Sequence, residues 1–335
     1  MNSIGHLFKV MIYGESHQQA IGAVIDGVLP GVFIDEELIR SDLKKRNPQL
    51  IGTTPRKEKD DFQITSGVFN GYTTGSPIHV MIENKDVISK DYEHLKSHPR
   101  PGHADFVSSI KYHGYHDYRG GGRFSGRLTA PIVIAGAIAK MMLPYTFSHQ
   151  LIQVGDLKDM NQLDDYLAKI SNQNDSVGGI IQVEVKGLPV GLGEPMFSKV
   201  ESMVGQMLFS IPAVKGVSFG IGFDGISLKG SDFNDQIINE QGKTKTNHQG
   251  GISGGISNGN PLVVNVFIKP TSSIKKEQKT YHLKSKNMDN LSIEGRHDVC
   301  IARRAGIVLE NATAIMLADL YLLSKTYKKE HHENN

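Results

Sequence analysis

Clusters of glycine constrain the fold of this chain more than any other feature of its sequence. The 335 residues include 36 glycines, and many of them stand in groups. The groups are Gly120–Gly122, Gly250–Gly251, Gly254–Gly255 and the stretch 216–225. Glycine adopts positive φ without steric cost and allows a backbone to approach a ligand closely. Turns account for some of these groups, but less easily for a triplet beside arginines. The clusters therefore indicate a large binding site lined by backbone amides.

Two glycine-rich segments resemble each other. In 67–78 and in 251–262, three glycines and one proline fall at the same spacing, and each segment runs into an apolar stretch. Chance similarity between glycine-rich loops and an internal duplication both account for this pattern. A duplication predicts two related halves packed around one site.

The apolar periodicity predicts helices and strands that come in groups. Helices are expected at 36–46, 132–142, 196–209 and 302–324. Strands are expected at 22–28, 62–69, 77–83, 179–186, 214–221 and 261–268. Regular strand–helix alternation is too rare for a Rossmann fold or a barrel, so an α+β arrangement is predicted. Residues 1–324 are expected to form a single domain, and the polar tail 325–335 is expected to fray.

Composition excludes several classes of protein. The formal net charge is only +2, so the chain as a whole has no strong positive potential that would attract nucleic acid. The single cysteine, Cys300, cannot form an intramolecular disulfide and fits a reducing compartment. The first 17 residues lack the apolar run of a signal peptide, and no stretch matches the ~20 apolar residues of a membrane helix. A cytoplasmic protein is predicted, without a membrane or nucleic-acid partner.

Three familiar motifs are rejected. Residues 220–225 have the spacing of a dinucleotide fingerprint, but the helix that must follow is missing and a strand–turn–strand is expected. No phosphate-binding Gly-x-x-x-x-Gly-Lys-Ser/Thr loop occurs. The pairs His94/His98 and His113/His116 have no further ligand nearby, so surface positions are expected and no metal site is predicted.

Charged residues and glycines combine in five segments that carry the chemistry. These are Gly14–His17, Arg100–Asp105, Arg119–Arg127, Lys269–Ser273 and Gly295–Cys300. Guanidinium groups bind carboxylate or phosphate, and free amides at the start of a helix add to the anion site. His103 stands two residues from Asp105, whose carboxylate can orient it. The segments predict a site for a ligand with several negative charges, where proton transfer and electrostatics dominate.

The same segments, in this order, resemble the chorismate synthase family. The similarity rests on Gly-Glu-Ser-His at 14–17, Pro-Gly-His-Ala-Asp at 101–105 and Arg-Gly-Gly-Gly-Arg-x-Ser-x-Arg at 119–127. Further matches are Lys-Pro-Thr-Ser-Ser at 269–273 and Arg-His-Asp-x-Cys at 296–300. One motif alone would be weak, but the series is specific and covers residues 4–324.

This resemblance implies a reaction. Family members catalyse the trans-1,4 elimination of phosphate from 5-enolpyruvylshikimate 3-phosphate, which gives chorismate for aromatic amino acid biosynthesis. They require reduced FMN, although the reaction has no net redox change, and NADPH enters only through reduction of the flavin. The resemblance also implies a layered sandwich of mainly antiparallel sheets with helices, a homotetramer, and either self-reduction of FMN or an external flavin reductase.

The resemblance further assigns residues. It implies that His17 stabilises or protonates the reduced flavin, that His103 protonates the departing phosphate and that Asp298 helps to take up the ring proton. The residues implied for the substrate are Ser16, Arg46, Arg127 and Arg296. Those implied for the flavin are Arg123, Phe124, Ser125, Pro212, Ala213, Gly254, Lys269, Pro270, Thr271, Ser272, Ser273 and Arg296.

The sequence departs from the family at a few positions, and other functions stay open. Gln18 replaces a frequent glycine, and Leu128 replaces a frequent glutamate. Many relatives have an arginine near Pro131, which is lost here, and a second arginine beside Arg46 is missing. A flavin-dependent oxidoreductase is the enzymatic alternative, although no nicotinamide site is evident. A nucleic-acid-binding protein is the other alternative, suggested by the basic loop 119–127.

Overall fold

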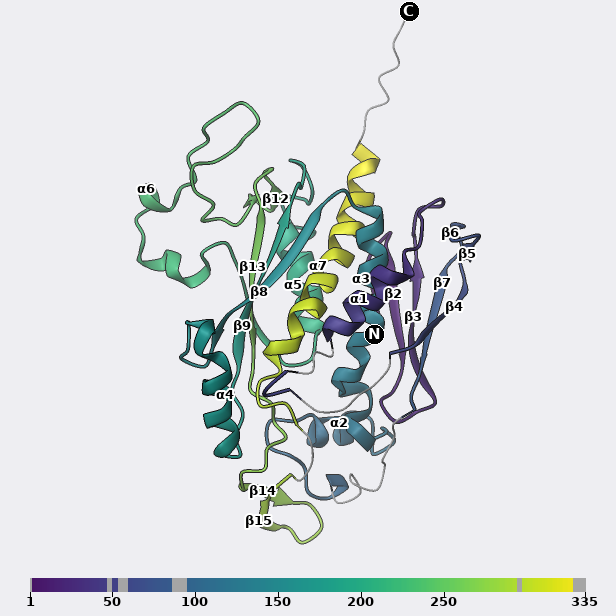
Figure 1. Cartoon of the computed structure of the whole chain (residues 1–335), viewed down its shortest axis with the longest axis vertical. Helices are drawn as coiled ribbons and strands as arrows, with labels where there is room; N and C mark the ends of the chain where they lie inside the picture. Colours follow the sequence, from purple (N-terminus) through teal and green to yellow (C-terminus); the bar gives the residue numbers. More distant parts are fainter. Residues whose placement is uncertain (1, 47–49, 54–59, 86–94, 294–296, 328–335) are drawn as a thin grey trace, which may run out of the picture.

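Two antiparallel sheets enclose a layer of helices (Figure 1). The computed structural model describes residues 2–46, 50–53, 60–85, 95–293 and 297–327. The predicted α+β sandwich is confirmed.

The first sheet has five strands and the second has four. In spatial order the first contains β1 (Ser3–Ile4), β2 (Lys9–Gly14), β3 (Ala20–Asp26), β7 (Ile78–Glu83) and β4 (Phe62–Ser66). The second contains β10 (Val214–Phe219), β13 (Leu262–Ile268), β9 (Gly179–Lys186) and β8 (Thr146–Val154). In β9 and β13 buried and partly exposed residues alternate, because successive side chains point to opposite faces of a sheet.

The helical layer lies between these sheets. It contains α1 (Glu36–Arg46), α3 (Thr129–Met142), α5 (Val200–Ser210) and α7 (Ala302–Ser324). Helix α3 packs against β2, β3 and β7, and α7 packs against β8 and β9. Gly136 of α3 has no side chain to keep the helices apart, and a Cβ there would lie 2.3 Å from the Asn311 backbone oxygen in α7. The sandwich therefore depends on a close crossing of its two central helices.

The order of elements repeats. The first half runs β2, β3, α1, β4, a small hairpin, β7 and α3, and the second runs β8, β9, α5, β10, a small hairpin, β13 and α7. The hairpins are β5 (Val68–Phe69) with β6 (Tyr72–Thr73), and β11 (Ile252–Ser253) with β12 (Ile256–Ser257). The strand orders β2-β3-β7-β4 and β8-β9-β13-β10 correspond position by position. Of the two readings of the similar segments, the duplication is the one that the structure supports.

Equivalent hydrogen bonds strengthen this conclusion. The Thr73 hydroxyl donates to the Leu29 carbonyl at 2.6 Å and accepts from the Val32 amide at 2.9 Å. The Ser257 hydroxyl donates to the Pro189 carbonyl at 2.6 Å and accepts from the Leu192 amide at 2.9 Å. In both halves a buried hydroxyl ties the small hairpin to the segment that follows the second strand.

Insertions distinguish the halves. Helix α4 (Leu163–Asn172) separates β8 from β9, whereas a short turn joins β2 to β3. Helix α2 (Asp105–Lys111) precedes α3, and the hairpin of β14 (Gln278–His282) and β15 (Asn287–Leu291) precedes α7. Figure 1 shows α2 and this hairpin at the same end of the molecule, below the central helices.

A buried polar network crosses the helical layer. Lys140 of α3 donates to Asp42 of α1 at 3.1 Å and also contacts Glu310 of α7. His149 of β8 lies 2.5 Å from the other Glu310 oxygen, and the Asn311 amide donates to Asp42 at 3.1 Å. Burial opposes ionisation of Asp42 and Glu310, but these partners outweigh it and keep both pKa values below their usual range.

Several details differ from the sequence predictions. The strand–turn–strand expected at 220–230 is wrong, because a 3-10 helix (Gly222–Ser227) and the short α6 (Gly230–Phe233) follow β10. His98 is buried, with its ring 5.0 Å from that of His282, and is not a surface residue. Within the tail expected to fray, residues 325–327 continue α7 as a 3-10 turn, and 328–335 lie outside the described residues.

Helix α7 differs from the prediction that no stretch of the chain matches a membrane helix. It has 23 residues and is apolar enough to span a bilayer, yet 89% of its most apolar window is buried inside the fold. It is the central core helix of the sandwich.

Candidate active site

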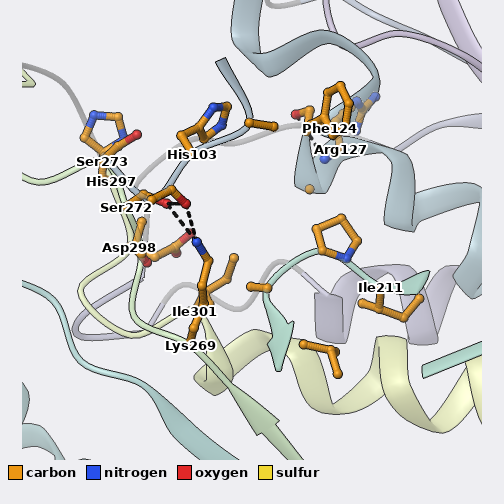
Figure 2. A pocket seen from close by; sticks show the side chains of 18 of the residues that line it. His103, Phe124, Arg127, Ile211, Lys269, Ser272, Ser273, His297, Asp298 and Ile301 are labelled. Atoms are coloured by element: carbon orange, nitrogen blue, oxygen red, sulfur yellow. Dashed lines mark hydrogen bonds between the residues drawn. The ribbon is translucent and has the colours of Figure 1, made fainter. Parts of the chain in front are cut away.

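The protein has a cavity of about 620 Å³, and Figure 2 shows side chains that line it. Corresponding segments of both halves line it, since the C-terminal ends of α1 and α5 and the loops before α3 and α7 all contribute. The segment after β13 and the turn after β2 complete the wall. The cavity therefore lies where the two halves meet.

Most of the predicted site residues line this cavity. They are Ser16, Arg46, His103, Arg123, Phe124, Ser125, Arg127, Pro212, Ala213, Lys269, Pro270, Thr271, Ser272, Ser273 and Asp298. Gly254 does not, because it lies in the hairpin before β13 whereas Lys269 follows the far end of that strand. His17 lies behind the wall, and Arg296 lies outside the described residues.

The charge of the cavity is strongly positive. Among the described lining residues, seven side chains are cationic and one is a carboxylate, that of Asp298. The cations are Arg46, Arg100, Arg123, Arg127, Lys215, Lys269 and Arg304. Such a wall favours a ligand with several negative charges. The described residues contain no group of His, Cys, Asp and Glu that could hold a metal.

The glycine triplet separates the two predicted histidines. A Cβ on Gly120 would lie 2.4 Å from the His17 ring, and a Cβ on Gly121 would lie 3.5 Å from the His103 ring. Gly120, Gly121 and Gly122 have φ of 57°, 80° and 50°. A side chain at Gly120 would displace His17, so the triplet lets a thin loop pass between the imidazoles.

His103 is oriented by a carboxylate, as its spacing from Asp105 predicted. Its Nδ1 lies 2.6 Å from Asp105 Oδ1, and its side chain is 20% exposed. Arg100 Nη2 lies 3.1 Å from the same nitrogen but donates to Asp105 Oδ1 at 2.8 Å. With the proton of Nδ1 directed at Asp105, Nε2 is the ring nitrogen left to exchange a proton.

Asp105 stays ionised in this arrangement. Burial opposes its negative charge, but hydrogen bonds from Arg100 and His103 outweigh burial and hold its pKa well below the usual range. Arg100 also donates to the Ser273 hydroxyl at 3.0 Å, which connects the His103 loop to the segment after β13. The loop of His103 is therefore fixed on two sides.

Lys269 makes a second connection to that loop. Its ammonium group donates to the Gly102 carbonyl and to the Ser272 hydroxyl, the latter at 3.3 Å (Figure 2). Burial and the neighbouring charge of Lys215 lower the pKa of Lys269. The Thr271 hydroxyl oxygen is buried on the same segment and has no hydrogen-bond partner among the described residues. This segment thus presents a cation to the cavity and keeps a buried hydroxyl without a hydrogen-bond partner among the described residues.

Two arginines of the first half share one carboxylate that the sequence analysis did not single out. Arg46 donates to Asp60 Oδ2 from Nε at 3.1 Å and from Nη2 at 2.6 Å, and Arg127 Nη1 donates to Asp60 Oδ1. Burial disfavours the charge of Asp60, but the two arginines outweigh it and lower its pKa. Only a run of charged residues around Asp60 marked it in the sequence.

Arg123 is held by the first sheet. Its guanidinium donates to the carbonyl of Ile12 at 2.6 Å and to that of Gly14 at 3.2 Å. Burial lowers its pKa. Apolar side chains also line the cavity: Phe124 lies beside Arg127 and Ile301 beside Lys269, while Ile211 and Pro212 follow the end of α5 (Figure 2). Asp298 lies on the side of Ser272 and His297, 3.5 Å from the Arg304 guanidinium (Figure 2).

Fold and cavity together describe an α+β protein of two related halves with a cation-lined cavity between them. The comparisons with known proteins give its family. A family model for chorismate synthase matches residues 8–322. The chorismate synthase of Chitinophaga pinensis is 51% identical over 328 residues, with 97% of this chain and 98% of that protein covered. That of Methanocaldococcus jannaschii is 41% identical, with 96% of each chain covered.

A solved crystal structure of chorismate synthase has the same fold. Its TM-score is 0.74 at 24% sequence identity, and the match covers 96% of this chain and 93% of that one. The chain belongs to the chorismate synthase family and is a lyase.

Proposed function

We propose that this enzyme eliminates phosphate from 5-enolpyruvylshikimate 3-phosphate in a trans-1,4 reaction that gives chorismate. One ring C–H bond and the C–O bond to phosphate break: the electron pair of the C–H bond forms a new C=C bond, the existing ring C=C bond moves to the adjacent position, and the electron pair of the C–O bond leaves with phosphate. The observation that carries the proposal is a cavity in which an oriented histidine, a carboxylate and seven cations meet.

The cations suit this substrate. It carries two carboxylates and one phosphate, and each can accept charge-assisted hydrogen bonds from guanidinium groups. Arg46 and Arg127 stand together on one side of the cavity, whereas Lys269 and Arg304 stand on segments of the second half. Ser16 and Ser125 add hydroxyl groups. Arg296, from the same motif as Asp298, belongs to the proposal on the family resemblance alone.

His103 is the proposed acid for the leaving group. Its Nδ1 is committed to Asp105, so its Nε2 delivers a proton to the phosphate oxygen as the C–O bond breaks. The negative Asp105 stabilises the protonated imidazole before the transfer. Arg100 keeps Asp105 in place and does not compete for Nε2.

Asp298 is the proposed acceptor for the ring proton. It is the only carboxylate among the described lining residues, and its side chain is 12% exposed. The guanidinium of Arg304 lies 3.5 Å from its Oδ1 and helps to hold the carboxylate in place.

The residues present fit a flavin. Phe124, Ile211 and Pro212 offer apolar contacts, Lys269 offers a polar one, and the buried Thr271 hydroxyl has no hydrogen-bond partner among the described residues. Reduced FMN bound there would supply an electron transiently and recover it, so that the reaction has no net redox change. Arg123, Ser125, Ala213, Pro270, Ser272 and Ser273 complete the proposed contacts, while Gly254 is proposed on the family resemblance alone. His17, behind Gly120, is proposed to hold a proton for the reduced cofactor.

Further parts of the proposal concern the whole protein. We propose one catalytic unit over 1–324, a cytoplasmic location and a homotetramer. Exposed aromatic side chains on the hairpin of β5 and β6, Phe69 and Tyr72, support self-association. NADPH is expected to act only through flavin reduction, by this chain or by a separate reductase.

An anaerobic assay tests the reaction. Phosphate release from 5-enolpyruvylshikimate 3-phosphate should require FMN together with dithionite, and should be absent with oxidised FMN. NADPH consumed in proportion to product would instead indicate a flavin-dependent oxidoreductase. Equal turnover without flavin would contradict the proposal.

A further inference from the structure

Asp60 joins two buried cationic side chains of the cavity, those of Arg46 and Arg127. The side chains of Arg46, Asp60 and Arg127 are 3%, 4% and 8% exposed. Each carboxylate oxygen serves one arginine: Oδ2 accepts from Arg46 and Oδ1 from Arg127. Asp60 itself does not line the cavity, whereas both arginines do. It therefore reaches the site through them.

Electrostatics explains the need for such a group. Two guanidinium groups brought together out of water repel each other and lose hydration. A carboxylate between them removes most of the repulsion and leaves the trio with one net positive charge. Because each arginine is held by a directed hydrogen bond, the planes of both forks are also fixed.

Asn84 extends the same connection. Its Oδ1 accepts from Arg127 Nε at 3.1 Å. Its Nδ2 donates to the carbonyls of Glu15 at 3.0 Å and Gln18 at 2.8 Å. Those two carbonyls flank Ser16 and His17, so Asn84 joins the arginine pair to the turn that carries both residues.

The origins of these residues make the connection informative. Arg46 ends α1, Asp60 stands two residues before β4, Asn84 follows β7 and Arg127 precedes α3. Four separate element ends of the first half meet in one network. A purely structural ion pair would not need to bring two cavity-lining arginines together in this way.

We propose that Asp60 is a positioning residue, which sets the Arg46 and Arg127 forks for a phosphate or carboxylate of the substrate and stays in place when that anion binds. Asn84 is the second positioning residue, because it fixes Arg127 relative to Ser16. The identity of the anion as part of 5-enolpyruvylshikimate 3-phosphate rests on the proposed function, but the anion site does not.

Calorimetric titration of the flavin-free protein with inorganic phosphate, at constant ionic strength, tests this role without turnover. Asp60→Asn should weaken phosphate binding at least tenfold, since one arginine then faces an amide NH₂ and the pair loses its order. Asp60→Glu keeps the charge on a longer side chain and should recover part of the affinity. In the flavin-loaded enzyme, Asp60→Asn should raise KM for the substrate more than it lowers kcat.

The matched control is Asp42→Asn. Asp42 is an equally buried carboxylate of α1 that binds Lys45 at 3.0 Å and Lys140 at 3.1 Å, and it does not line the cavity. This variant should lose thermal stability and keep wild-type phosphate affinity. If Asp42→Asn lost as much phosphate affinity as Asp60→Asn, general destabilisation would explain both losses, and the proposal would be overturned.

Two outcomes would overturn it directly. Phosphate binding to Asp60→Asn that is unchanged or tighter would show that Asp60 is a scaffold or a competitor of the anion. If Asp60→Asn does not fold, Asn84→Ala provides the test. It should weaken phosphate binding about threefold, and unchanged phosphate affinity in this variant would contradict the proposal. Intact phosphate binding in the wild type without elimination activity would contradict the proposed function and leave this inference standing.

Discussion

Single residues in this site act through partners that fix their orientation. His103 lies on a loop, yet Asp105 holds its Nδ1 and Arg100 holds Asp105 at 2.7 Å and 2.8 Å. Lys269 and Ser272 both bind the Gly102 carbonyl next to it. The histidine can therefore present Nε2 from a loop with the precision usually given by a helix or strand.

A substitution of His103 separates chemistry from binding. His103→Ala should lower kcat by about 10²–10⁴, the usual contribution of a general acid, with a smaller change in KM. Asp105→Asn should reduce kcat less, because the imidazole remains but loses its oriented tautomer. Single-turnover phosphate release measures both variants. Unimpaired phosphate release in His103→Ala would show that His103 is not the general acid.

Arg127 allows a different test of residue type. Arg127→Ala should raise KM strongly, because a charge-assisted hydrogen bond is worth about 1.5–3 kcal/mol. Arg127→Lys should restore only part, since an ammonium group cannot contact Asp60 and Asn84 simultaneously with a planar fork. Steady-state kinetics at fixed ionic strength measures this difference, and full rescue by lysine would argue against the fork geometry.

At the scale of elements, the repeat places the site. The ends of α1 and α5 correspond, as do the loops before α3 and α7, and all four line one cavity. The first half supplies the Arg46–Asp60–Arg127 network, and the second supplies the apolar Ile211–Pro212 wall with Lys269. Equivalent positions in the two halves thus carry different chemistry.

The two corresponding hydroxyl groups of Thr73 and Ser257 allow the contributions of the two small hairpins to stability to be compared. Thr73→Val and Ser257→Ala each remove a buried hydroxyl that makes two hydrogen bonds. Each should lower the free energy of unfolding by about 1–3 kcal/mol, since a backbone amide and a carbonyl lose their partner. Urea denaturation measures both. A loss in only one variant would show that the two hairpins are not energetically equivalent.

The sequence predicted the long elements well and the connections poorly. Residues 36–46, 179–186 and 302–324 match α1, β9 and α7, because apolar periodicity and flanking prolines or glycines mark them. Strand β8 is rich in polar residues and was missed, since Val154 is the only one of its residues that is buried. Local spacing revealed His103 with Asp105, whereas Asp60 could not be assigned, because its partners Arg46 and Arg127 are 14 and 67 residues away.

At the scale of the whole molecule, ionised carboxylates hold parts of the chain together. Asp60 joins α1 to the loop before α3, Asp105 fixes the His103 loop, and Asp42 with Glu310 connects α1, α3 and α7. In each of these four carboxyl groups burial raises the pKa, but partners outweigh it and the net direction is downward. These groups link the stability of the fold to pH.

The sign of this linkage predicts acid sensitivity. A carboxyl group whose pKa is lower in the folded state contributes stability that is fully present above its unfolded pKa of about 4. That contribution is lost as the pH falls through the folded pKa, because the unfolded chain then binds more protons. The free energy of unfolding, measured by urea denaturation between pH 7 and pH 3, should therefore stay nearly level to about pH 5 and then fall.

Variants assign this loss to particular groups. Asp42→Asn should lower stability at pH 7 and flatten the acid limb, because one linked carboxyl group is gone. Asp165→Asn is the matched control, because Asp165 is an exposed carboxylate in the first turn of α4 and takes no part in the buried network. Its acid limb should follow the wild type. An acid limb of unchanged steepness in Asp42→Asn would mean that the buried network across the helical layer does not govern the response of this fold to acid.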